Sequence, residues 1–199
     1  MLVKGKYLEK TKCYLVFLFC ILIFKNIYAQ DITNELNKYN NELKNSSISF
    51  IQSDGETVEE GKIYIGQERI RVDYFVPNKI SIILSKNKGV YLNHSLKEAQ
   101  YFNTGRSFVK FFFEIFSETN FFKTADLIEI QNSINISKEV TLDDKTYSIK
   151  VIYENNPIKI RKIYIEGNEE GYEMGFFEFN KSEGYNKAFY SLVNPYLGG

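Results

Sequence analysis

Few side chains of this sequence combine the types and spacing that catalysis requires. His94 is the single histidine among 199 residues, and its neighbours Asn93 and Ser95 indicate a hairpin turn, so we interpret it as a surface residue rather than a general base. The acidic pairs Asp143-Asp144 and Glu169-Glu170 fall in or beside expected turns, and the first lacks the ligand spacing of a Ca²⁺ loop. The sequence contains no phosphate-binding loop, nucleophile elbow or zinc-binding histidine pair. We therefore expect neither an enzyme nor a metal or cofactor site.

The first 29 residues differ in composition from the rest of the chain. Four lysines precede a run of mostly apolar residues over 13–24, and Ala29 then offers a small residue for cleavage before Gln30. This is the order of a secretory signal, and the apolar run is shorter than the roughly 20 residues that span a membrane. We predict a signal peptide over residues 1–29, cleaved near Ala29, and a single exported domain over residues 30–199. An uncleaved N-terminal anchor is the alternative.

Removing this leader changes the charge and the cysteine content of the protein. The whole chain has 25 basic and 25 acidic side chains, but five lysines and one glutamate lie in the leader, so residues 30–199 keep 20 basic and 24 acidic groups. This balance argues against a nucleic-acid partner, because such binding depends on a basic surface that releases phosphate counterions. Cys13 and Cys20 both belong to the leader, so the exported domain has no disulfide and relies on its core for stability.

The spacing of apolar residues changes once near the start of the domain. Apolar side chains at helical spacing predict a helix over Ile32–Leu43, with Asp31 as its cap. From Ser47 onward apolar residues alternate with polar ones, which predicts strands, and the turns between them are short. Parallel strands need connections of about a dozen residues or more, so neighbouring strands should be antiparallel. The alternating residues of this first half are Ile48, Phe50, Ile63, Ile65, Ile70, Val72, Tyr74, Ile80, Ile82, Leu84, Val90 and Leu92.

A second helical spacing interrupts the strands after Ser107, where five of the next nine residues are phenylalanine. Residues 118–133, which include Phe121-Phe122 and Leu127-Ile128, are interpreted as an irregular or partly helical connection. Further strands are predicted at Ile134–Leu142, Tyr147–Tyr153, Ile158–Ile165 and Tyr172–Phe179, with a last edge strand at Phe189–Leu192. The simplest account is an α+β fold in which one antiparallel sheet of about nine or ten strands is accompanied by two or three helices.

Short motifs follow one another in a characteristic order over residues 31–116. The main ones are Phe50-Ile51-Gln52, Glu60-Gly61, Arg69-Ile70-Arg71-Val72-Asp73-Tyr74, Pro77 and Lys88-Gly89-Val90-Tyr91-Leu92-Asn93. In this order and spacing, the sequence resembles the periplasmic outer-membrane lipoprotein carriers of the LolA type, with weaker similarity as far as Leu197. The resemblance implies an unclosed half β-barrel covered by helices, whose concave apolar cavity shields the acyl chains of a lipoprotein that crosses the periplasm.

The resemblance also implies partners. They are the lipoprotein cargo, an ATP-driven inner-membrane complex that releases it, and an outer-membrane acceptor. The protein itself is expected to be a monomer in the periplasm. The alternative is an exported binding or sensor module of the same open-barrel type, which binds another lipid or a signalling partner.

The sheet, the N-terminal helix and the Phe-rich segment are the expected walls and lid of the cavity. A curved sheet of this size, if it stays open, has a concave face too wide for its own side chains to fill. The alternative is that the Phe-rich segment is ordinary core. The predicted cavity residues are Leu36, Phe50, Ile63, Ile65, Ile80, Ile82, Leu84, Phe108, Phe111, Phe112, Ile115 and Phe116.

The sequence departs from the family at the place linked to cargo transfer. The family usually has an Arg-Pro pair there, whereas this chain reads Gly66-Gln67-Glu68. The nearest cations, Arg69 and Arg71, are therefore the candidates for handing cargo on. Alternatively, both lie on the solvated face of their strand.

Overall fold

The computed structural model describes residues 32–107, 109–117, 120–142, 144–167 and 171–197. The predicted signal peptide over residues 1–29, the predicted cap Asp31 and the predicted cavity residue Phe108 lie outside the described residues. So do Asp143 and the Glu169-Glu170 pair.

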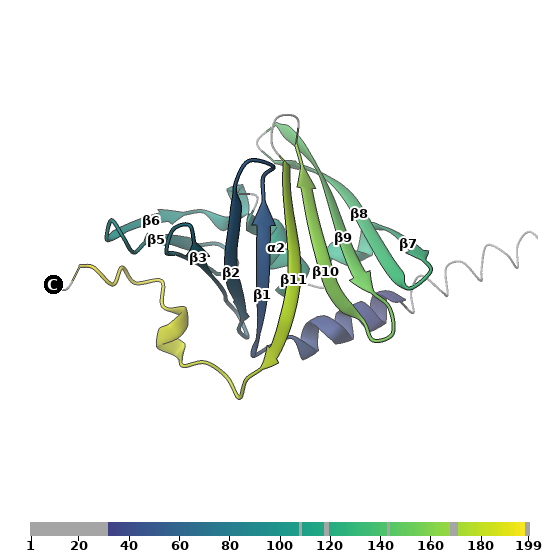
Figure 1. Ribbon diagram of the computed structural model, residues 1–199, viewed down its shortest axis with the longest axis horizontal. Coiled ribbons are helices and arrows are strands. Elements are labelled where there is room, and N and C mark those ends of the chain that lie inside the picture. Colours follow the sequence, from purple (N-terminus) through teal and green to yellow (C-terminus); the bar gives the residue numbers. More distant parts are fainter. Residues whose placement is uncertain (1–31, 108, 118–119, 143, 168–170, 198–199) are drawn as a thin grey trace, which may run out of the picture.

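Eleven strands form one antiparallel sheet, in the order β6-β5-β4-β3-β2-β1-β11-β10-β9-β8-β7 (Figure 1). Two meanders, β1 to β6 and β7 to β11, join where β1 pairs with β11. β6 and β7 are the two edges, so the described sheet does not close, and the predicted half-barrel of the α+β class is confirmed. The strands are β1 (Ser46–Ser53), β2 (Val58–Ile65), β3 (Ile70–Val76), β4 (Ile80–Leu84), β5 (Gly89–Asn93), β6 (Glu98–Phe102), β7 (Asp126–Ile130), β8 (Ser133–Leu142), β9 (Lys145–Glu154), β10 (Lys159–Glu166) and β11 (Gly171–Lys181).

Helices cover one face of this sheet. The N-terminal helix spans residues 32–42. The chain between the two edge strands forms η1 (Thr104–Arg106), α2 (Val109–Ser117) and α3 (Asn120–Lys123). Because this connection runs from one edge of the sheet to the other, α2 crosses the concave face, where Figure 1 shows it behind β1, β2 and β11. A last 3-10 turn, η2 (Lys187–Tyr190), belongs to the C-terminal segment, which is residues 182–197 after β11.

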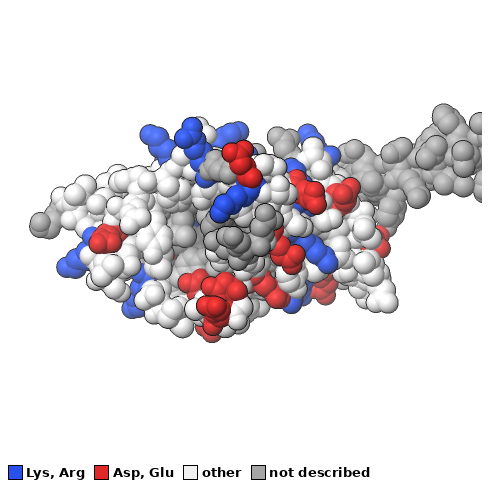
Figure 2. All heavy atoms as spheres, turned by 90° about the horizontal axis from the view of Figure 1, so that it is seen from above, with Lys and Arg blue, Asp and Glu red and all other residues white. Residues whose placement is uncertain are grey.

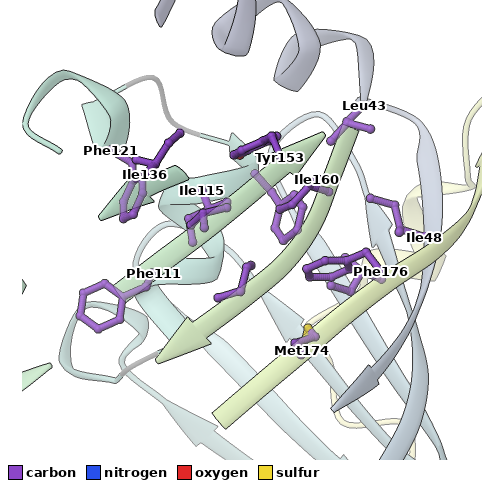
Figure 3. Close-up of a cluster of buried hydrophobic side chains, with 14 of the residues drawn as sticks. Leu43, Ile48, Phe111, Ile115, Phe121, Ile136, Tyr153, Ile160, Met174 and Phe176 are labelled. Carbon is purple, nitrogen blue, oxygen red and sulfur yellow. The ribbon is translucent and has the colours of Figure 1, made fainter. Parts of the chain in front are cut away.

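The main core lies between the helices and the concave face. Figure 3 shows Ile115 of α2 among side chains that come from strands far apart in the sheet, and Phe111 of the same helix belongs to this cluster. Tyr153 of β9 and Phe176 of β11 are part of the same cluster, with exposed fractions of 0% and 5%. Burial of such aromatic and branched side chains is the main source of stability for a domain without disulfides.

A smaller core lies on the opposite, convex face. Ile83, Val90 and Leu92 point away from the helices because their strands alternate in register, and they are buried under Leu192 and Tyr196 of the C-terminal segment. The C-terminal segment is thus a cover for the outside of β4 and β5.

Local predictions were wrong at both edges of the sheet and in the C-terminal segment. Leu127-Ile128 belong to strand β7; Ile128 is 56% exposed, so apolar residues occur on both faces of this strand and hide the alternation. Strand β6 was not predicted because its two aromatic residues, Tyr101 and Phe102, are adjacent and face opposite sides of the sheet, which obscures the alternation. Phe189–Leu192 is not a strand, since its first residues form η2, which Asn186 caps by accepting from the Ala188 N–H.

Candidate functional site

Helix α2 is apolar around most of its circumference. Phe111, Phe113, Ile115 and Phe116 are buried, and Phe112 is partly buried. Its two charged residues, Lys110 and Glu114, pair one helical turn apart at 3.4 Å. A helix that is apolar nearly all round normally lies inside a protein. Here it occupies the concave side of a sheet that stays open at both edges.

The predicted cavity residues of the sheet lie side by side on the concave face. Facing strands arrange them in rows, because residues paired across antiparallel strands point to the same side. The two rows are Ile63, Val72 and Ile82, and Ile65, Ile70 and Leu84. Leu36, Ile63, Ile65 and Leu84 are at most 1% exposed, whereas Ile80 and Ile82 are partly buried. Together with the side chains of α2 they fill the concave side, so a ligand there requires α2 to move.

Phe50 keeps its place in the sheet wall through the glycine opposite it. A Cβ atom on Gly61 would lie 2.6 Å from the Phe50 ring and 2.4 Å from the Asp73 carbonyl oxygen, so only glycine fits this position. The Phe50 ring in turn packs edge to face against Tyr74, with ring centres 5.2 Å apart. The sheet wall around Phe50 therefore stays apolar and closely packed.

A buried polar contact holds α2 in this position. The Asn40 side chain, 7% exposed, donates from Nδ2 to the carbonyl oxygen of Ile115 at 2.5 Å. The last carbonyls of a helix have no partner within it, and Ile115 is among them. Asn40 thus ties the N-terminal helix to the end of α2, and we call this contact the Asn40 latch.

A cavity of about 540 Å³ adjoins the same end of α2. It is lined by Phe113 and Ser117 of the helix and by the turns over residues 67–69 and 85–88. Pockets for small ligands commonly have volumes of about 300–1,000 Å³. Because Phe113 is both a wall of this cavity and part of the main core, the cavity borders directly on the concave interior.

The two arginines proposed for cargo transfer have different surroundings. Arg69 lines the cavity next to Phe113 and donates to the carbonyl oxygen of Tyr190 at 2.6 Å. Arg71 lies on the convex face, donates from Nε to Asp73 at 2.8 Å and from Nη1 to the Phe189 carbonyl oxygen at 2.9 Å, and stacks over the Phe189 ring at 4.3 Å. Both arginines therefore hold the C-terminal segment against the sheet. Arg69 in addition lies at the mouth of the site, by which we mean the cavity beside α2.

His94 belongs to a polar network on the convex face that the sequence did not reveal. Ser81, 2% exposed, donates to Asp73 at 2.6 Å and lies 2.8 Å from His94 Nε2, while the Tyr196 hydroxyl lies 2.7 Å from Nδ1. In a Ser-His-Asp triad the histidine lies between the other two, whereas here the serine does. The network links β3 and β4 to the C-terminal segment.

The charges on the face seen in Figure 2 are mixed, and the described residues hold no cluster of metal ligands. Figure 2 shows both signs of charge on the upper face, with acidic groups in its lower part and basic ones along its upper edge. Within the described residues, no group of three or more His, Cys, Asp or Glu is arranged to hold a metal ion. No helix among the described residues is both long and apolar enough to cross a membrane.

Three tyrosine hydroxyls point into the concave side. That of Tyr39 accepts from the Ile160 N–H at 3.1 Å, and that of Tyr74 donates to Gln52 at 3.1 Å. Burial raises the pKa of Tyr39 to about 12 and also raises the pKa values of Tyr74 and Tyr153 well above the ordinary value, so all three stay protonated at neutral pH.

These tyrosines predict a loss of stability in alkali. Because the unfolded chain releases the Tyr39, Tyr74 and Tyr153 protons near pH 10 and the folded chain holds them, the free energy of unfolding should fall above pH 10, by about 1.4 kcal/mol per pH unit for each group. Urea unfolding at pH 9, 10 and 11 measures the fall, and Tyr153→Phe should make it shallower. Equal free energies at pH 9 and 11 would contradict the prediction.

No family model and no curated protein matches the sequence. Among solved structures, an uncharacterized conserved protein from Thermus thermophilus is similar (TM-score 0.52, 10% identity, 81% of this chain and 91% of that one covered). MucB in complex with MucA(peri) has a TM-score of 0.44 at 10% identity over 83% of this chain and 60% of that chain, less than two thirds of its length. LprF from Mycobacterium bovis has a TM-score of 0.42 at 7% identity over 78% of this chain and 94% of that chain. The similarity to the Thermus protein shows that the unclosed, helix-covered sheet recurs as a fold in another bacterial protein.

Proposed function

We propose that this protein is an exported carrier that binds the acyl chains of lipoproteins on the concave side of its sheet and moves them between membranes. The observation that carries the proposal is the place of α2, a short and almost wholly apolar helix inside an open sheet, next to a cavity. Its side chains occupy the volume that acyl chains would fill. The order of motifs that resembles lipoprotein carriers supports the same conclusion.

The energetics suit a carrier that must release its cargo. Burying one CH₂ group contributes about 0.8 kcal/mol, so a sixteen-carbon chain gains roughly 12 kcal/mol on full burial. Moving α2 aside exposes its four buried side chains, at about 1.5–3 kcal/mol each. The cost of roughly 6–12 kcal/mol offsets between half and all of the gain from one chain. Loading and release can then be nearly balanced, with an energy-driven donor supplying the difference.

In this proposal the protein works in the periplasm, after cleavage near Ala29, as a monomer. It receives its cargo from an ATP-driven inner-membrane complex and passes it to an outer-membrane acceptor. Arg69, at the mouth beside α2, is the better placed of the two arginines to contact the cargo during transfer. To check export and cleavage, the protein is expressed from the full sequence, recovered from the periplasm, and its intact mass is measured. A mass that still includes residues 1–29 would contradict the cleavage, and absence of the protein from the periplasm would contradict the export.

The central experiment uses this purified protein and a tripalmitoylated hexapeptide. Gel filtration should show the lipopeptide eluting with the protein in equal amounts, whereas the same peptide without acyl chains should elute alone. Mass spectrometry of lipids that co-purify with the protein adds a second readout. Failure to bind the lipopeptide would contradict the carrier, and a co-purified lipid of another class would favour the alternative binding module.

A further inference from the structure

The hydroxyl of Tyr153 is buried without a hydrogen-bond partner. Tyr153 lies on β9 opposite Ile134 and Ile160, is 0% exposed, and finds no donor or acceptor for its hydroxyl among the described residues. An unpaired hydroxyl in an apolar core costs about 1–3 kcal/mol. Phenylalanine would fill the same space without this cost, and it is the more frequent aromatic in this chain, at 17 residues against 15 tyrosines. A buried hydroxyl of this kind normally has a hydrogen-bond partner.

The surroundings of Tyr153 restrict what this partner can be. Its ring packs edge to face against Tyr39 of the N-terminal helix at 5.9 Å and against Phe122 of α3 at 6.2 Å. Figure 3 shows Tyr153 in the main core, near Ile136 and Ile160 and on the same side of the sheet as Ile115 of α2. A charged group in such surroundings would lose its hydration without a counter-charge. The partner is therefore a neutral polar group carried by an apolar molecule.

The hydroxyl of Tyr39, whose ring packs against Tyr153, indicates that the missing partner is a hydrogen-bond acceptor. The Tyr39 oxygen already accepts from the Ile160 N–H, so its remaining strong capacity is to donate. Tyr39 also directly precedes Asn40, so a movement of the N-terminal helix that releases the Asn40 latch alters the space beside Tyr39 and Tyr153 as well.

We propose that the Tyr153 hydroxyl, assisted by Tyr39, donates a hydrogen bond to the ester carbonyl of an acyl chain bound on the concave side. The protein then prefers acyl esters to ethers of the same length. This inference rests on the proposed function, since it places a ligand where α2 now lies. Toward the lipid both hydroxyls act as donors, while the Tyr39 oxygen keeps accepting from the Ile160 N–H, and no covalent bond of the lipid is made or broken.

The test measures the binding of two ligands that differ in a single carbonyl group, each to the wild-type protein and to Tyr153→Phe. The ligands are palmitoyl lysophosphatidylcholine and its hexadecyl ether analogue, and their dissociation constants are measured by displacement of a fluorescent fatty acid. The wild-type protein should bind the ester about fivefold more tightly than the ether, which is the size of one net hydrogen bond. In Tyr153→Phe this ratio should fall to about one, with the affinity for the ether unchanged. Tyr164→Phe on the outer face of β10 is the matched control and should keep the ratio.

The melting temperature of the unliganded protein gives an independent readout. Tyr153→Phe should melt at the same temperature as the wild type or higher, because the hydroxyl it removes has no partner among the described residues. Equal affinity of the wild type for ester and ether, a ratio that persists in Tyr153→Phe, or a melting point lowered by several degrees would each overturn the inference and leave the carrier function standing. Binding of neither lipid would contradict the carrier function as well.

Discussion

Replacing Phe116 by alanine is expected to tighten the binding of the tripalmitoylated peptide by about 10- to 100-fold. Phe116 lies on α2 at 1% exposure, and truncating a buried phenylalanine removes about 3–5 kcal/mol of packing. If α2 is a lid, this packing stabilises the closed state against which the ligand competes. The variant then opens more often, and the apparent affinity rises with the open fraction. The gain stays below the full packing energy because Phe116 also lies where an acyl chain would bind. Titration of the lipopeptide against both proteins measures the change.

The matched control is Phe176, the aromatic residue of the sheet that contacts the Phe116 ring. Phe176 of β11 packs edge to face against Phe116, with ring centres 5.9 Å apart, and is 5% exposed. Phe176→Ala should lower the free energy of unfolding by about 3–5 kcal/mol but raise the affinity less than Phe116→Ala does, because part of its packing is with neighbouring strands and persists when α2 opens. If the two variants unfold equally easily and neither binds more tightly, α2 is ordinary core and the lid is disproved.

The strands that could be predicted from the sequence are those with one face on the main core. In β3, Ile70 and Val72 are buried and Arg71 is only partly so, and this alternation is visible in the residue types. Edge strands β6 and β7 lack it because they pair on one side only and pack little. The C-terminal segment cannot be predicted for a different reason: η2 is held by the side chains of Arg69 and Arg71, which come from more than 100 positions earlier in the chain.

In the candidate site, too, local patterns can be predicted from the sequence, whereas contacts between distant residues cannot. The sheet residues of the concave face follow from alternation, and the N-terminal helix and α2 from helical spacing. The contacts that would give the site its function are not visible in any local pattern. Asn40 meets Ile115 across 75 positions of sequence, and Tyr39 meets Ile160 across 121. A polar residue on an apolar helix face, such as Asn40 between Leu36 and Leu43, is the one signal of such a contact that the sequence offers.

Replacing Asn40 by aspartate is expected to loosen α2 on the concave face. The amide that donates to the Ile115 carbonyl becomes a carboxylate, so two acceptors face each other in a buried position. An uncompensated buried group of this kind costs about 1–3 kcal/mol and more when it is charged. The amide protons of α2 should therefore exchange with solvent at least about 10- to 100-fold faster at neutral pH, while those of β1 and β11 in the centre of the sheet keep their protection.

Two comparisons make the outcome of Asn40→Asp specific to the latch. Asn41→Asp places the same charge one residue further along the N-terminal helix, where the side chain is exposed, and should leave the exchange of α2 unchanged. Lowering the pH to about 4 should restore part of the protection in Asn40→Asp, because a protonated carboxyl group can donate to the Ile115 carbonyl as the amide did. Unchanged exchange in Asn40→Asp would show that apolar contacts alone hold α2. The free energy of lid opening would then have to come from the Phe and Ile side chains, and Phe116→Ala would be the only one of these two substitutions able to change it.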